Sequence, residues 1–185
     1  MLRRRTLMLL AAALPAACAS PNPNLYTLMP LPGPARTGAP KTIELRSVAL
    51  ARYLERSQIV RSSEDFRLDV LGNDWWGEPL DAMLSRVLVQ NLSQRLPGST
   101  VLPENGAITP GSDTMVAVNL ERLDADQGGA VILVAQASVG QGSSTATRAF
   151  RFSVTPPSAG TPGLVSAMST AVAQLSDGIA AMLAR

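Results

Sequence analysis

The stretch that decides the fold runs from Trp76 to Gly98 and reads WGEPLDAMLSRVLVQNLSQRLPG. Pro79 suits the first turn of a helix, where its missing N–H costs nothing, and Pro97-Gly98 marks the end. Apolar residues recur at a spacing of three to four, which is the helical period: Leu80, Met83, Leu84, Val87, Leu88 and Leu92. Such a stripe cannot stay in water, so we expect this helix to pack on another layer.

The remaining residues predict strands and a second helix. Alternating or apolar runs predict short strands at 42–50, 58–61, 66–71, 99–102, 115–123, 131–139 and 149–154. Residues 131–139 are almost wholly apolar, which is typical of a central strand covered on both faces. The second helix is expected over 164–183, with this apolar stripe: Leu164, Met168, Val172, Leu175, Ile179 and Met182. The fold class is therefore α/β of the α+β kind, a single compact domain over 41–185 in which two main amphipathic helices pack on a mixed, mostly antiparallel sheet.

The pattern of residues 1–17 predicts a signal peptide: a basic start, a short apolar core and small residues before Cys18. The apolar run is too short to cross a bilayer, which argues against a membrane anchor. Leu14-Pro15-Ala16-Ala17-Cys18 resembles the bacterial lipobox, with Pro15 as a departure, so we expect a lipid on Cys18. The alternative is an ordinary cleavage nearby that leaves a free thiol, which would be a liability in an oxidising compartment.

Residues 18–40 are predicted to be a lipidated N-terminus followed by a proline-rich tether. Six of the 14 prolines lie in this part of the chain, and proline favours extended backbone over helix. Within it, Leu25–Leu28 reads as a short strand that starts the sheet.

Composition excludes several classes of function. The chain has no histidine, one cysteine and one lysine, Lys41, which removes Ser-His-Asp, Cys-His and CxxC chemistry and histidine-containing zinc sites. Arg3, Arg4 and Arg5 belong to the predicted signal peptide. After its removal the chain holds 13 basic and 14 acidic residues, a net charge of −1, so no basic patch for nucleic acid is expected. We assign no catalytic residue, no cofactor and no metal. Asp124 and Asp126 are interpreted as turn residues because they lack the further ligands of a calcium loop.

Two motifs carry a family resemblance. Residues 53–61, YLERSQIVR, and residues 76–80, WGEPL, are similar to signatures of the ABC-type transport auxiliary lipoproteins. Leu88 and Asn91-Leu92-Ser93 continue the second signature, and Leu25–Leu28 fits the opening of the family. The resemblance covers about residues 18–185.

The resemblance implies a non-catalytic accessory role. Family members resemble periplasm-facing lipoproteins that work with an MCE-domain protein of an ABC-type or Pqi-type transporter, moving lipids between membranes and supporting envelope integrity. The resemblance also implies that Cys18 is acylated, with palmitate among the acyl groups, and that several copies can form a homo-oligomeric ring. Ala19 and Ser20 replace the aspartate that would favour the inner membrane, which points to the periplasmic face of the outer membrane. The alternative is a periplasmic carrier or sensor that holds a lipid between sheet and helices.

Six residues are candidates for contact with a partner, and each has a structural alternative. Trp75 and Trp76 would present a hydrophobic contact or else fill the edge of the core. Tyr53 and Arg56 lie in the first signature and would face the MCE partner; Arg56 could instead pair with Glu55, Glu64 or Asp65.

The second helix supplies the other two candidates, Ser169 and Ala173. Its second face is uncharged, so we expect it to meet a neighbouring subunit of a ring. The alternative is that this face of small residues packs within the same domain.

Overall fold

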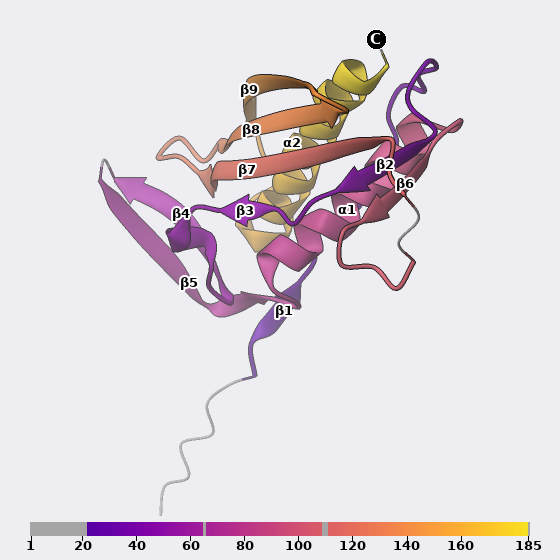
Figure 1. The fold of residues 1–185 in the computed structure, drawn as a ribbon. Helices are drawn as coiled ribbons and strands as arrows, with labels where there is room; N and C mark the ends of the chain where they lie inside the picture. Colours follow the sequence, from indigo (N-terminus) through magenta and orange to yellow (C-terminus); the bar gives the residue numbers. More distant parts are fainter. Residues whose placement is uncertain (1–21, 65, 109–110, 185) are drawn as a thin grey trace, which may run out of the picture.

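The computed structural model describes residues 22–64, 66–108 and 111–184. Two sheets and two long helices make up one domain (Figure 1). The strands are β1 Asn24–Tyr26, β2 Thr42–Leu45, β3 Ala49–Leu50, β4 Gln58–Glu64, β5 Arg67–Trp76, β6 Thr100–Pro103, β7 Thr114–Ala125, β8 Val131–Gln141 and β9 Ser144–Val154. The helices are the 3₁₀ turn η1 Arg52–Leu54, α1 Leu80–Arg95 and α2 Gly160–Leu183.

The larger sheet has six strands, three of which form an antiparallel meander. β7, β8 and β9 pair antiparallel in sequence order, while β2 and β3 both pair parallel to β7 and β6 pairs parallel to β2. Cross-strand partners such as Val118 and Ala137 place the apolar residues of neighbouring strands on one face.

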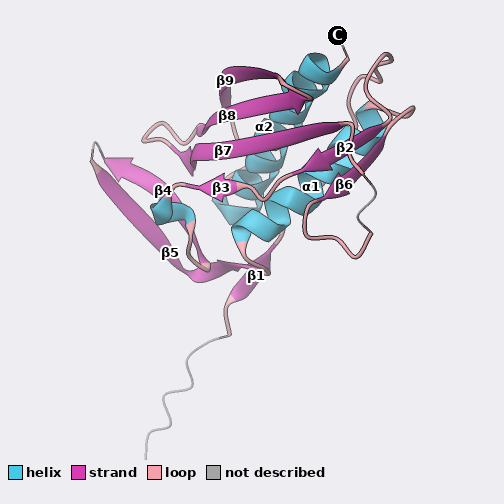
Figure 2. Cartoon of the chain, in the orientation of Figure 1, coloured by secondary structure: helices cyan, strands magenta, loops and turns pink. Residues whose placement is uncertain are grey.

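The two helices cover one face of this sheet (Figure 2), α2 against β7–β9 and α1 against α2 and β6. Every residue of both predicted apolar stripes is buried. The β8 residues that face the helices are at most 1% exposed: Val131, Leu133, Ala135 and Ala137. The α+β class with two packed amphipathic helices is therefore confirmed. On the second face of β8, Ile132 is buried but Gln136 is exposed, so the prediction of cover on both faces holds only near the start of the strand.

A separate three-stranded sheet, in the order β1-β5-β4, was not anticipated. β4 and β5 form a long hairpin that leans away from the larger sheet (Figure 1). Phe66 was predicted to lie in the strand, but the structure places it in the turn with a positive φ of 69°. The hairpin changes register between Gln58 and Val60, where β5 carries three extra residues opposite β4. Alternation in the sequence cannot reveal such an irregularity, because the period itself changes there.

Residues 24–36 are packed on the domain, which corrects the prediction that they belong to a proline-rich tether; the short strand predicted at Leu25–Leu28 is present as β1. β1 pairs parallel with the end of β5, and Leu28 is fully buried. The backbone N–H of Met29 donates to Ser169 Oγ at 3.1 Å, and that of Leu31 donates to Asn91 Oδ1 at 2.9 Å. Prolines prevent a helix here, but an extended chain can still satisfy its remaining donors with side-chain acceptors. The domain therefore starts near residue 24.

Candidate functional site

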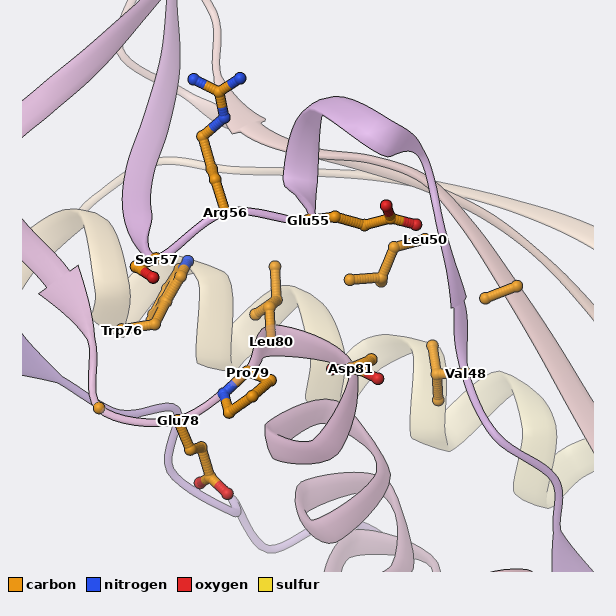
Figure 3. Close-up of a pocket in the computed structure, with 12 residues that line it drawn as sticks. Val48, Leu50, Glu55, Arg56, Ser57, Trp76, Glu78, Pro79, Leu80 and Asp81 are labelled. Atoms are coloured by element: carbon orange, nitrogen blue, oxygen red, sulfur yellow. The ribbon is translucent and has the colours of Figure 1, made fainter.

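The two signature segments come together around one open groove of about 720 Å³ (Figure 3). Its lining comes from three parts of the chain: Val48–Leu50, Glu55–Ser57 and Trp76–Asp81. The first part includes β3, the second follows η1, and the third joins the end of β5 to the start of α1. Neither motif lines the groove alone, so the fold explains why both belong to one site.

Local structure fixes the position of each wall. The backbone N–H of Trp76 donates to Ser57 O at 2.7 Å, and that of Gly77 donates to Tyr26 O at 2.8 Å. These bonds hold the start of α1 beside the segment that follows η1. Pro79 is the N-cap of α1, one position before the first helical turn that the sequence predicted for it. Met83 N–H donates to the Pro79 carbonyl at 3.0 Å, which begins the helix directly below the groove.

One wall of the groove is an open sheet edge. Ala49 and Leu50 pair with Asn119 and Leu120 of β7 on one side, and within the described residues no strand pairs with the other side of β3. The apolar side chains of Leu50 and Leu80 approach each other across the groove (Figure 3). An extended segment entering here would meet unpaired backbone groups at one wall and apolar surface at the other.

Charged side chains surround this apolar centre. Glu55, Arg56 and Asp81 are exposed at the rim, and Arg56 extends away from the groove (Figure 3). Glu78 also points outward and accepts a hydrogen bond from Arg86 Nη2 at 2.6 Å. Among the described side chains Arg56 forms no ion pair with Glu55, and its other suggested partners, Glu64 and Asp65, lie outside the described side chains. The groove thus has an apolar centre and a mixed polar rim, as docking surfaces do.

Tyr53 does not line the groove. Its hydroxyl donates to Asp124 Oδ2 at 2.6 Å, and Asp124, only 2% exposed, also accepts two hydrogen bonds from Arg122, at 2.8 and 3.0 Å. Burial raises the pKa of Tyr53 well above its ordinary value, and the Asp124 carboxylate raises it further. Asp124 lies within strand β7, one residue before its end, so its prediction as a turn residue is wrong. Asp126 begins the turn, and its side chain accepts a hydrogen bond from the Ala130 N–H.

Replacing Tyr53 by phenylalanine is expected to lower the free energy of unfolding by about 1–2 kcal/mol at neutral pH, because a hydrogen bond to a buried carboxylate is lost. The folded-state pKa of Tyr53 is above the unfolded value near 10, so the stabilisation is complete below about pH 10 and decreases above it. Urea unfolding at several pH values should therefore show the two proteins converging above pH 10. A gap that stays constant would contradict this coupling.

The other sequence candidates lie in different environments. Trp76 is 7% exposed and belongs to the main core, while Trp75 is half-buried and its Nε1–H donates to Gly72 O at 3.1 Å. Ser169 and Ala173 are 3% and 7% exposed, beneath the N-terminal segment. In this conformation they are not part of the surface that a neighbouring subunit would meet. Cys18 and the predicted signal peptide lie outside the described residues.

Arg95, the buried side chain with the most hydrogen bonds among the described residues, was not singled out from the sequence. Its side chain is 1% exposed and its Nε donates to Asp177 Oδ1 at 2.5 Å. Its other donors reach the carbonyls of Leu31, Asn91 and Ala173 at 3.0–3.2 Å. One sequence signal could have pointed to the pair of Arg95 with Asp177: α2 carries little charge, and Asp177 is its one acidic residue.

Within the described residues, no group of three or more acidic or cysteine side chains is placed to hold a metal ion. In the same part of the chain, no helix is both long and apolar enough to span a bilayer.

Comparison with known proteins assigns this α+β domain to a family of lipoproteins. The model of the ABC-type transport auxiliary lipoprotein component matches residues 26–180, and the chain belongs to that family. It is 30% identical over 103 residues to the intermembrane transport lipoprotein PqiC of Escherichia coli and to that of Shigella flexneri. That alignment covers 53% of this chain and 55% of each PqiC, so the chain spans about half the length of the curated relatives it matches.

Solved structures show the same fold. A crystal structure of an uncharacterised protein aligns over 88% of this chain and 99% of its own, with a TM-score of 0.76 and 24% identity. A protein from Xanthomonas campestris aligns over 88% of this chain and 95% of its own, with a TM-score of 0.71 and 20% identity. These likenesses concern the fold alone.

Proposed function

We propose that the protein is a non-catalytic lipoprotein, anchored by Cys18 to the periplasmic face of the outer membrane, that docks an MCE-domain component of an intermembrane lipid transporter. The groove formed by the two signature segments carries the proposal, since it is where the residues typical of the family meet. Similarity to PqiC, an intermembrane transport lipoprotein, supports the transport role. Docking would help to maintain the envelope, and a ring of several copies would present several grooves.

The shape of the groove favours a polypeptide occupant. β3 offers an unpaired edge beside Leu50 and Leu80, and addition of an extended strand to such an edge combines backbone hydrogen bonds with apolar contacts. Glu55, Arg56 and Asp81 at the rim would select register and orientation more than they would add affinity.

The alternative, a lipid carrier, needs space between sheet and helices. That region is filled by side chains that are at most 1% exposed, among them Leu133, Ala135, Met168, Val172 and Leu175. A carried acyl chain would have to displace this packing, so the docking role is favoured.

Crosslinking in native membranes tests the proposal. A photoreactive residue at the exposed Ala49, which lines the groove, is expected to capture an MCE-domain protein identified by mass spectrometry. Ala49→Arg fills the groove with a bulky charge and is expected to reduce recovery of the partner at least tenfold, a loss of about 1.4 kcal/mol of binding free energy.

Ala117→Arg, at an exposed position of β7 outside the groove, is the matched control and should leave recovery unchanged. Equal loss in both variants would show that the groove is not the docking site. Stoichiometric phospholipid with no protein partner would favour the carrier instead.

A further inference from the structure

The three-stranded sheet has an apolar outer face, which we define by Leu25, Leu68, Val70 and Trp75. Cross-strand partners lie on the same side of a sheet, and the register pairs Leu25 with Trp75, Trp75 with Gln58, Val70 with Val60 and Leu68 with Ser62. Gln58, Val60 and Ser62 alternate along β4 and therefore point to one side. Adjacent Ile59 points to the other side, into the main core.

The side chains that define this outer face are exposed or half-buried although most of them are apolar, while Val60, which points to the same side, is buried. Leu25 is 67% exposed, Leu68 46% and Val70 41%, and fully exposed Phe66 extends the surface at the hairpin tip. Arg67 and Asp69 alternate with Leu68 and Val70 along β5 and pair with each other at 3.3 Å. An apolar surface of this kind marks a contact that the isolated chain does not satisfy.

The length of chain before β1 indicates what lies against this surface. Leu25 is seven residues after Cys18, and an extended chain spans at most about 3.5 Å per residue, so the two are at most about 25 Å apart. An acylated Cys18 would thus keep the outer face close to the bilayer. Tryptophan suits the boundary between lipid and water, as does an apolar patch backed by polar groups.

We propose that the outer face lies on the phospholipid surface that holds the lipid anchor, with Leu25, Leu68 and Val70 entering the boundary between headgroups and acyl chains. This rests on the proposed lipidation of Cys18. Trp75 and Trp76 are adjacent in a strand and point to opposite sides. The membrane contact and the groove lined by Trp76 therefore lie on opposite sides of β5, so that the bilayer orients the groove for its partner.

A fluorescent probe tests this contact in the full lipidated chain. With Cys18 acylated, Leu68→Cys carries the only free thiol, which can bear a label sensitive to polarity. Met115→Cys is the matched control, since Met115 is 45% exposed but lies at the start of β7, far from the hairpin (Figure 1). Each labelled protein is reconstituted into vesicles of phosphatidylethanolamine and phosphatidylglycerol. We expect emission at shorter wavelength, and quenching by nitroxide-labelled lipid, for the label at 68 and not at 115.

Three other outcomes can be distinguished from the expected one and from each other. If the protein floats with the vesicles but both labels remain in water, the anchor stands and the membrane contact is wrong. If the protein does not float and Cys18 reacts with the label, the lipidation fails and both proposals lose their basis. Disulfide-linked dimers formed by Leu68→Cys alone would show that the outer face meets a second copy, which would also overturn the membrane contact.

Discussion

Replacing Arg95 by alanine is expected to lower the free energy of unfolding by about 3 kcal/mol, one of the two largest effects that the structure predicts. The guanidinium joins α1 through Asn91 O, α2 through Asp177 and Ala173 O, and the N-terminal segment through Leu31 O. Its loss removes the buried donors to Asp177 and to the carbonyls of Leu31, Asn91 and Ala173. The effect lies at the lower end of the range for buried pairs because the Asp177 side chain is 37% exposed and can be hydrated.

The N-terminal segment should respond more than the rest of the domain. The Arg36 N–H donates to the Arg95 carbonyl at 2.7 Å, and Gly33 lies so close to the guanidinium that an added Cβ would be 2.4 Å from it. We therefore expect faster hydrogen exchange and proteolysis in residues 29–36 of the Arg95→Ala variant. Gly33→Ala should reproduce part of this effect by steric conflict with the same group.

Arg86→Ala is the control for Arg95→Ala. Arg86 is also on α1 and also pairs with a carboxylate, Glu78, but both side chains are more than a third exposed. Surface pairs of this kind contribute at most about 1 kcal/mol. Urea denaturation of the three proteins should place Arg86→Ala close to the parent. Equal losses in the two variants would show that burial is not the cause.

Replacing Trp76 by alanine is the second large effect, with an expected loss of about 3–5 kcal/mol. Trp76 is 7% exposed in the main core and forms part of the groove wall, so the substitution leaves a cavity between the two sheets and α1. Trp75→Ala, one residue earlier, should cost much less stability because that side chain is half-buried on the outer face.

The two tryptophan variants separate stability from membrane contact. Trp75→Ala should retain a cooperative unfolding transition while weakening the expected response of the label at 68. Chemical denaturation and probe emission measure these effects independently. Similar losses of stability in both variants would contradict the assignment of the adjacent side chains to opposite faces of β5.

The ring contact predicted through Ser169 and Ala173 cannot be tested by substituting these two residues. Arginine at either position would enter a buried site beneath the N-terminal segment and destabilise the domain whether or not a ring forms. A change in the mass of the assembly, caused by such a variant, would therefore not identify a subunit interface. The oligomeric state is better probed at exposed positions, since the variants must fold before they assemble.

The sequence by itself determined the elements whose signal is local. The spacing of Leu80–Leu92 predicted α1, and the stripe from Leu164 to Met182 predicted α2. The alternating runs at 115–123 and 149–154 and the apolar run at 131–139 predicted β7, β8 and β9, because each pattern reports on one element against one core. The two signatures likewise identified the family without any coordinates. Tertiary structure alone decided how these parts meet, since sheet edges and buried polar groups depend on residues far apart in the chain. It separated β1, β4 and β5 into their own sheet, covered Ser169 and Ala173 with residues 24–36, and buried Arg95 between three elements. It also brought both signatures to one groove, because the open edge of β3 lies beside the start of α1.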